Sequence, residues 1–140
     1  MKQDFQEICK KLNISPSITR KQIYNYLDSH RTHPTVDEIY HDLVVDLHTL
    51  SKTTVYNVLK LFIRHNLVNV INTTENEKRY EINDMKHSHF LCKVCNKLYD
   101  IPQVTLSYDK SKLSGFSIED EQVTLIGICP NCMRKQKKIN

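Results

Sequence analysis

The sequence lacks an apolar run long enough to cross a membrane, a cationic-plus-apolar leader and internal repeats, and it holds only two glycines in 140 residues. The first two absences predict a soluble, cytoplasmic protein with no membrane partner. Net charge is also small, at +4. Residues 1–82 carry 11 Lys+Arg against 10 Asp+Glu, and residues 83–140 carry 9 against 6. This balance permits nucleic-acid binding but does not by itself predict it.

Cysteine is present in a pattern that indicates a metal. Four of the five cysteines form two Cys-x-x-Cys pairs, Cys92 with Cys95 and Cys129 with Cys132. Two such pairs are typical of a tetrahedral structural zinc site, in which four thiolates bind the ion at about 2.3 Å. The alternative, disulfides or inert buried thiols, fits the regular spacing less well. Cys9 is left over and is expected to be buried in a helix as a small hydrophobe.

Hydrophobic spacing predicts four helices followed by a hairpin in the first part of the chain. The expected helices are residues 4–13, one capped by Thr19, one opened by a capping box of Thr35 and Glu38, and one capped by Ser51. Residues 67–71 and 78–82 alternate as strands around a polar turn at 72–77. This order is the plan of a winged helix-turn-helix, whose last helix enters the major groove of DNA.

The fourth predicted helix has the most regular pattern in the chain. Its apolar stripe is Val55, Val58, Leu59, Phe62 and Ile63. The opposite face therefore presents hydroxyl, amide, cationic and aromatic side chains, which are Thr53, Tyr56, Asn57, Lys60 and Arg64. Such groups can read base edges, but a solvated helix face would look similar, and both interpretations stay open on this pattern alone.

Residues 83–86 are polar and lack periodicity, so we expect a hinge there between a DNA-binding domain at 1–82 and a second domain at 87–140. The fold class is α+β. In the second domain, strands are expected at 89–93, 97–101 and 122–128, a turn onto the second cysteine pair at Gly127, and a solvated tail at 134–138.

His87 and His89 precede the first cysteine pair. Side chains at i and i+2 of a strand share a face, so both imidazoles can reach one ion. Imidazole together with carboxylate suits iron, manganese or zinc, whereas four thiolates select zinc. The alternative is a pair of surface histidines, and the residues alone do not decide between the two.

Taken in order, these motifs resemble the ferric uptake regulator family of bacterial metal-dependent repressors. The resemblance runs from Thr19-Arg20 through His33-Pro34-Thr-Val-Asp-Glu-Ile-Tyr40, Thr54-Val-Tyr56, Arg79-Tyr80-Glu81 and the His-x-His to the late Cys-x-x-Cys. It implies a winged helix followed by a small α/β dimerisation domain with a structural Zn²⁺ on the four cysteines. It also implies homodimers that bind palindromic operator DNA and have no enzymatic activity.

The resemblance further implies a regulatory Fe²⁺ or Mn²⁺ whose ligands come from both domains. These ligands are His33, Glu81, His87, His89 and Asp100. An ion held by both domains would fix their angle and hence the spacing of the recognition helices on the operator. With the family motifs added, the predicted DNA-binding set is Arg20, Lys52, Thr53, Thr54, Tyr56, Asn57, Lys60 and Arg64.

Two branches of this family remain possible. Asn57, the short His-Ser-His, the absence of a histidine-rich tail and Asp100 resemble the peroxide-sensing branch, which we favour. Glu81 points instead to the iron-responsive branch, although Glu121 stands where that branch would have a histidine. The segment after Asp100 is shorter than in familiar members and poorly helical, which predicts a reduced dimer interface.

Functions of other classes are a zinc-stabilised protein-interaction module without metal gating and a zinc hydrolase. The module needs only the four cysteines. The hydrolase would use Glu81 beside the histidines as its general base, but nothing in the sequence supplies a substrate pocket.

Overall fold

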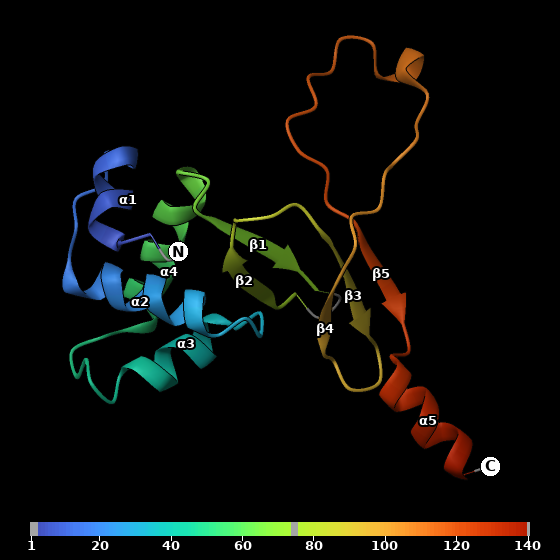
Figure 1. Cartoon of the computed structure of the whole chain (residues 1–140), viewed down its shortest axis with the longest axis horizontal. Coiled ribbons are helices and arrows are strands. Elements are labelled where there is room, and N and C mark those ends of the chain that lie inside the picture. Colours follow the sequence, from blue (N-terminus) through green and yellow to red (C-terminus); the bar gives the residue numbers. More distant parts are fainter. Residues whose placement is uncertain (1–2, 74–75, 140) are drawn as a thin grey trace. The chain divides into compact units, whose positions relative to one another are not determined.

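The computed structural model describes residues 3–73 and 76–139. The chain divides into two compact units, Met1–Asp84 and Met85–Asn140. Each unit has its own sheet, of two and three strands respectively (Figure 1). Within the described residues, no helix combines the length and the apolar character that a membrane span requires.

The first unit opens with four helices, α1 (Phe5–Leu12), α2 (Ile18–Ser29), α3 (Val36–Leu43) and α4 (Lys52–Arg64). The predicted capping box of α3 is confirmed, because Thr35 accepts from the Glu38 backbone and the Glu38 side chain accepts from Thr35 N–H. The cap of α4 at Ser51 is also confirmed. The cap expected at Thr19 is wrong: α2 begins earlier, because extended Ser17 follows Pro16 and accepts from Arg20 N–H at 3.1 Å.

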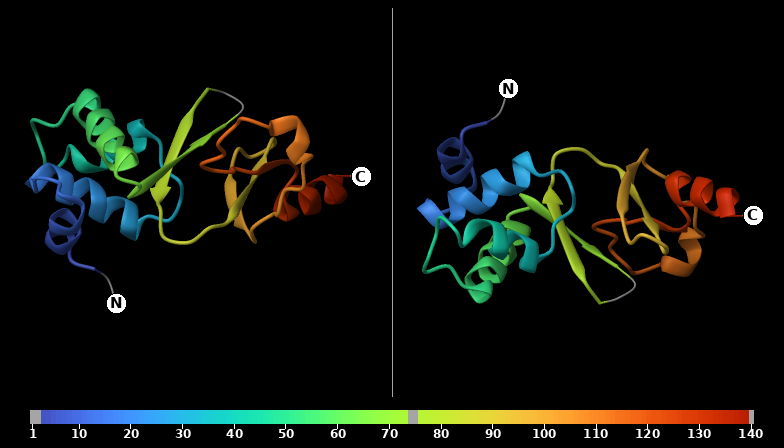
Figure 2. Two further views of the ribbon diagram at one scale, coloured as in Figure 1. Left: turned by 90° about the horizontal axis from the view of Figure 1, so that it is seen from above. Right: turned by 90° about the horizontal axis from the view of Figure 1, so that it is seen from below.

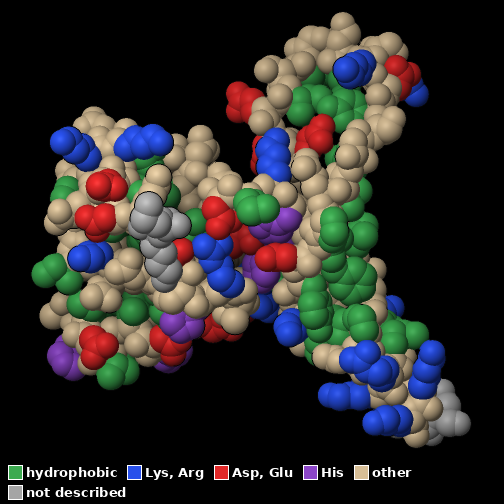
Figure 3. Space-filling model, viewed as in Figure 1, with side chains coloured by type: hydrophobic (Ala, Val, Ile, Leu, Met, Phe, Trp, Pro, Cys, Tyr) green, Lys and Arg blue, Asp and Glu red, His purple; other side chains and the backbone are tan. Residues whose placement is uncertain are grey.

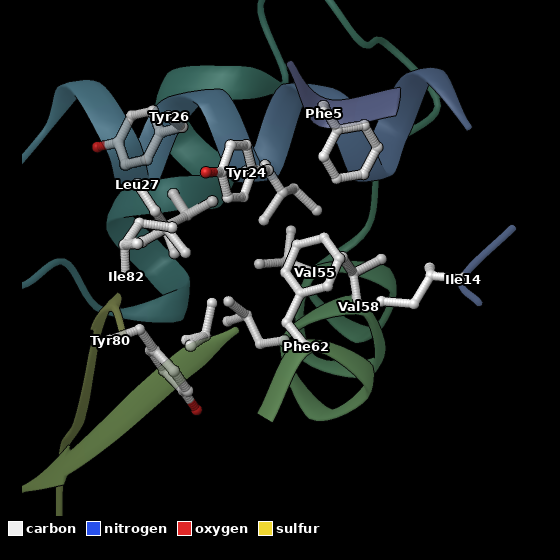
Figure 4. Packing of buried hydrophobic residues seen from close by; sticks show 14 of the residues in the cluster. Phe5, Ile14, Tyr24, Tyr26, Leu27, Val55, Val58, Phe62, Tyr80 and Ile82 are labelled. Atoms are coloured by element: carbon white, nitrogen blue, oxygen red, sulfur yellow. The ribbon is translucent and has the colours of Figure 1, made fainter. Parts of the chain in front are cut away.

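Apolar side chains from all four helices form one core. Figure 4 shows residues of α1 and α2 facing Val55 and Phe62 of α4, and both α4 residues are completely buried. The Phe5 ring lies edge-on to the Phe62 ring, with centroids 6.2 Å apart. Cys9 is buried in α1, as predicted. Each large buried side chain contributes about 1.5–3 kcal/mol, so this core can hold the unit folded.

The hairpin β1 (Val68–Asn72) and β2 (Lys78–Ile82) completes the first unit. The strands are antiparallel, with Val70 opposite Tyr80. Tyr80 and Ile82 are buried in the helical core, and α1 to α4 gather on one side of the hairpin (Figure 2). Helices followed by a packed hairpin confirm the predicted winged helix. Residues 74–75 of the predicted turn at 72–77 lie outside the described residues.

The second unit contains β3 (Ser88–Cys92), β4 (Leu98–Ile101), β5 (Thr124–Gly127) and α5 (Pro130–Ile139). The strand order is β4-β3-β5; β4 runs antiparallel to β3, and β5 runs parallel to it. A parallel pair requires a long crossover, and residues 102–123 supply it with only one 3-10 turn, η1 (Lys110–Leu113). We call residues 102–123 the arm.

One expectation for this unit is wrong. Gly127 does not turn the chain, because it is a strand residue of β5; a Cβ there would lie 3.1 Å from Phe90 Cζ, so close packing against that ring explains the glycine. The solvated tail expected at 134–138 is confirmed as exposed, and it is helical as part of α5. Pro130, whose fixed φ suits the first turn of a helix, opens α5, which has few apolar residues and is rich in lysine.

Candidate metal centres and nucleic-acid interface

Four cysteines meet in the second unit. Cys92 ends β3, Cys95 lies in the following turn, Cys129 precedes α5 and Cys132 is in its first turn. All are free thiols, and their sulfur atoms lie within 4.8 Å of one another. Cys95 Sγ and Cys129 Sγ are 3.9 Å apart, near the roughly 3.8 Å between two thiolates of a tetrahedral zinc site. The cluster therefore fits a structural zinc ion.

Hydrogen bonds prepare this cluster for an ion. The pKa of Cys92 is lowered to about 6, chiefly by hydrogen bonding from the Cys95 backbone, while burial acts against that shift. The Cys129 N–H donates to Cys92 Sγ at 3.3 Å. Burial raises the pKa of Cys132 to about 12. Adjacent thiolates repel one another, so a divalent cation is needed to stabilise all four together.

Sequence reasoning missed Tyr99, a residue of β4 beside this cluster. Its hydroxyl hydrogen-bonds to Cys129, which raises the pKa of Tyr99 to about 12 and lowers the pKa of the Cys129 thiol. Tyr99 lies opposite Phe90 in the sheet register, so the signal was a tyrosine on the strand that pairs with the cysteine-bearing strand. The phenol supports the anionic thiolate from outside the ligand set.

A second group in this unit brings together His87, His89 and Asp100. The Nε2 atoms of the two histidines are 3.0 Å apart. His87 Nε2 lies 3.2 Å from Asp100 Oδ1, and His89 Nε2 lies 3.4 Å from the same oxygen. His89 and Asp100 are neighbours across the β3–β4 ladder. The Met85 carbonyl accepts from His87 Nδ1 at 2.7 Å, so in the neutral ring Nε2 carries the lone pair that a metal needs.

The first unit contains a buried histidine–carboxylate pair. His33 Nε2 lies 3.1 Å from Glu81 Oε2, and the residues are 5% and 8% exposed. His33 joins α2 to α3 with a left-handed φ of 56°. The following Pro34 carbonyl accepts from Tyr80 N–H at 3.0 Å, which ties this loop to β2 next to Glu81. Burying a carboxylate is costly without a partner, and this arrangement supplies one.

The outer face of α4 carries most of the predicted DNA-binding residues. Lys52, Thr53, Thr54, Tyr56, Asn57, Lys60 and Arg64 are all exposed. Lys60 Nζ lies 5.6 Å from the centroid of the Tyr56 ring. Lys52 Nζ lies 3.2 Å from Asp37 Oδ1, which links the start of α4 to α3. The face thus presents donors, a ring and cations at helical spacing.

Arg20 lies apart from this face, near the start of α2, and is half-buried. Its Nη1 donates to the Ser15 carbonyl at 2.5 Å. This bond fixes the guanidinium beside the first turn of α2, where the unsatisfied N–H groups of a helix favour phosphate.

Comparison with known proteins places these features in one family. The model of the ferric uptake regulator family matches residues 11–126. The peroxide-responsive repressor PerR of Staphylococcus aureus strain Mu50 is 31% identical over 127 residues, which cover 89% of this chain and 84% of that protein.

Solved structures agree at the level of the fold. The ferric uptake regulator Fur of Helicobacter pylori has a TM-score of 0.69 at 21% identity, covering 91% of this chain and 88% of that chain. PerR from Streptococcus pyogenes has a TM-score of 0.53 at 27% identity, covering 91% and 89%. The predicted α+β class, with a winged helix and a small second sheet, is therefore confirmed.

Proposed function

Because this chain belongs to the ferric uptake regulator family, we propose that it is a metal-gated transcriptional repressor that binds palindromic operator DNA as a homodimer. The observation that carries the proposal is the pair of histidine–carboxylate groups, one in each unit. His33 with Glu81 and His87 with His89 and Asp100 offer imidazole nitrogens and carboxylate oxygens at hydrogen-bonding distances. A solvated surface histidine would not explain the burial of His33.

The regulatory ion is proposed to be Fe²⁺ or Mn²⁺ held by both groups at once. Three imidazoles and two carboxylates form a mixed nitrogen and oxygen shell that suits these cations. When bound, the ion would fix the angle between the DNA-binding unit and the unit that pairs in the dimer. That angle sets the spacing of the two recognition helices, which must match half-sites about one turn of DNA apart. Metal affinity and operator affinity then raise each other by the same factor.

The test of metal gating compares His89→Ala with His48→Ala. His89 is a proposed ligand, whereas His48 is an exposed residue outside both groups. Operator binding is followed by fluorescence anisotropy while Mn²⁺ is added to protein that retains its zinc. We expect the parent protein and His48→Ala to bind the operator only with Mn²⁺, and His89→Ala to need far more metal. Operator binding that ignores chelation of the exchangeable metal would refute gating and favour a zinc-stabilised interaction module.

The proposed DNA contacts divide into base reading and phosphate binding. Asn57 can pair with adenine through two hydrogen bonds. Asn57→Ala should therefore reduce the free energy of operator binding by about 1–3 kcal/mol and relax the sequence preference at one base pair. Lys60→Ala should weaken binding to all DNA sequences alike. It should also reduce the slope of log affinity against log salt concentration by about one unit. Lys10→Ala, a change at an exposed lysine of α1, serves as the control.

Within the family we propose peroxide sensing. The similarity to a peroxide-responsive repressor supports this branch, as do Asn57 and Asp100 in the sequence. Iron-loaded protein treated with dilute peroxide should gain one oxygen atom on His33 or His89 and lose operator binding, whereas manganese-loaded protein should resist. Peptide mass spectrometry measures the adduct. The absence of an adduct would favour the second candidate, an iron-responsive repressor. The presence of glutamate at position 81 supports that candidate.

A further inference from the structure

The strand β5 leaves one edge of its sheet open. In the order β4-β3-β5 it is the outer strand and pairs with β3 on its other side. Leu125 and Ile126 are 47% and 56% exposed, and hydrophobic side chains form a band along this side of the unit (Figure 3). Natural edge strands usually carry a charge or a proline that blocks pairing, but Thr-Leu-Ile-Gly has neither. This edge is suited to a second strand.

Opposite charges flank the open edge. Before β5, the end of the arm carries Glu119, Asp120 and Glu121 in succession, which we call the acidic stretch. After β5, the helix α5 carries Arg134, Lys135, Lys137 and Lys138, and residues 124–139 contain no acidic residue. Figure 1 places the arm and α5 at opposite ends of β5. Among the described side chains, no ion pair joins the acidic stretch to α5 within one copy.

The charge is also unevenly divided between the two units. Residues 1–84 contain 11 Lys+Arg and 11 Asp+Glu, whereas residues 85–140 contain 9 and 5. The whole excess of +4 therefore lies in the unit that contains β5. Concentrating positive charge in that unit would oppose its self-association unless basic and acidic segments of two copies meet.

We propose that the acidic stretch of each copy receives the basic helix α5 of a second copy, so that two charge clamps close the dimer on either side of β5. The inference rests on the homodimer of the proposed function and identifies the surfaces through which the two copies contact each other. A twofold dimer presents the same patch from both copies, and two β5 edges related in this way pair antiparallel. With the axis between Leu125 and Ile126, residues 119–121 of one copy lie opposite residues 130–132 of the other.

The geometry of α5 suits this contact. Arg134 to Lys138 lie within roughly 12 Å of the start of the helix, along its axis, so they follow directly after the position opposite the acidic stretch. Glu121 Oε1 accepts from the Tyr108 hydroxyl at 2.9 Å, which holds this carboxylate in place within the arm. Glu119 and Asp120 are exposed. Asp120 Oδ2 accepts a long hydrogen bond from Gln122 Nε2 at 3.4 Å, but a neutral amide leaves the carboxylate charge available to cations of the second copy. Because the arm has little helix of its own, charge complementarity would compensate for a small apolar interface.

The test uses two charge-reversed proteins and their mixture. One carries Glu119→Lys and Asp120→Lys, which leaves Glu121 and its bond to Tyr108 intact. The other carries Lys135→Glu and Lys138→Glu, which leaves the cysteines unchanged. A control carries Lys10→Glu and Lys11→Glu on α1, with the same change in net charge as the second protein. Zinc content and circular dichroism confirm that all remain folded.

Sedimentation measures dimer dissociation at low and high salt. We expect each reversed protein alone to dimerise at least roughly tenfold more weakly than the parent in 0.1 M salt, with the difference reduced at 1 M salt, where the screening length falls to about 3 Å. The control should match the parent. An equimolar mixture of the two reversed proteins should recover dimers that are predominantly mixed, because both clamps of a mixed dimer again join opposite charges.

Other outcomes overturn the proposal in distinguishable ways. A parent protein that is monomeric at all concentrations refutes the homodimer itself and with it the proposed function. Parent-like dimerisation of both reversed proteins, with statistical mixing, refutes the clamps but leaves the repressor intact. If the α5 reversal leaves the dimer unchanged and instead weakens operator binding, the basic helix contacts DNA and not a second copy.

Discussion

The two units hold themselves together by different means. The first buries an apolar cluster from four helices and a hairpin, with Phe62, Leu59 and Ile23 completely covered. In the second, one buried cluster consists of three cysteines, with Phe90, Tyr99 and Ile128 packed against it. Leu91 and Leu98 are also buried there, but a single core of so few hydrophobic side chains rarely stabilises a unit of 56 residues by itself. The comparison indicates that hydrophobic burial folds the first unit and metal binding folds the second.

The largest expected effect is the loss of the second unit without its metal. Cys92→Ser should release zinc and unfold residues 85–140 while the first unit stays folded, since structural zinc contributes on the order of 10 kcal/mol in small domains. Metal analysis and residue-resolved amide NMR signals measure both effects. Cys9→Ala, which changes the cysteine in the helical core, should leave the zinc content unchanged. A zinc-free variant that stays folded and dimeric would break the comparison and the four-thiolate assignment.

The reciprocal change removes a side chain from the apolar core. Phe62→Ala should destabilise the first unit by about 3–5 kcal/mol, because a large cavity opens at a completely buried position. Zinc content and the amide signals of the second unit should not change. Phe116→Ala is the matched control, because Phe116 is 71% exposed in the arm. If both units unfold together at the same urea concentration, they form a single cooperative structure and the comparison fails.

The sequence predicted the first unit well because its signals are local. Helical periodicity located α1 to α4, and the spacing of Thr35 and Glu38 correctly predicted a capping box. The second unit depends on contacts between distant residues. The parallel pairing of β5 with β3 follows a 22-residue arm and leaves no local pattern. The helix α5 has few apolar residues, so hydrophobic spacing gave little sign of it.

The candidate site shows the same difference between local signals and long-range contacts. Regular spacing was enough to predict that Cys92, Cys95, Cys129 and Cys132 would lie together, because each pair is a local motif. The packing of His33 against Glu81 could not be derived from residue spacing, since it depends on a left-handed backbone before Pro34 and on β2 lying beside that loop. A family motif, not a physical pattern, nominated these two residues. Tyr99 was missed for a similar reason, because its partner Cys129 lies far from it in the sequence.

A smaller effect on stability is expected at the N-terminal end of α3, in the first unit. Thr35→Ala should destabilise the first unit by about 1–2 kcal/mol, because it removes the hydroxyl that accepts from the Glu38 N–H in the first turn of α3. Urea unfolding followed by helical circular dichroism measures the loss. The exposed Thr53→Ala on α4 provides a control that removes a hydroxyl without removing a cap. Equal stability of the two variants would show that α3 is held by core packing alone.

The smallest expected effect concerns a polar bond at the edge of the first core. The Tyr26 hydroxyl donates to Asp42 Oδ2 at 2.6 Å, and burial together with this bond raises the pKa of Tyr26 far above its usual value. The folded state therefore favours the neutral phenol, so this contribution is complete below the unfolded pKa of about 10 and is lost as pH rises beyond it. Tyr26→Phe should cost about 0.5–1.5 kcal/mol at neutral pH.

Above pH 10, the stability of the parent protein should fall towards that of Tyr26→Phe, because the unfolded chain releases a proton that the folded chain retains. Urea titrations at several pH values, read from amide signals of α2, measure the convergence. Tyr56→Phe, at an exposed ring on α4, should follow the parent throughout. A constant gap between the parent protein and Tyr26→Phe from pH 7 to pH 11 would mean that the hydroxyl stabilises the unit without any linkage to its own ionisation, and the polar edge of the first core would then contribute no sensitivity to pH.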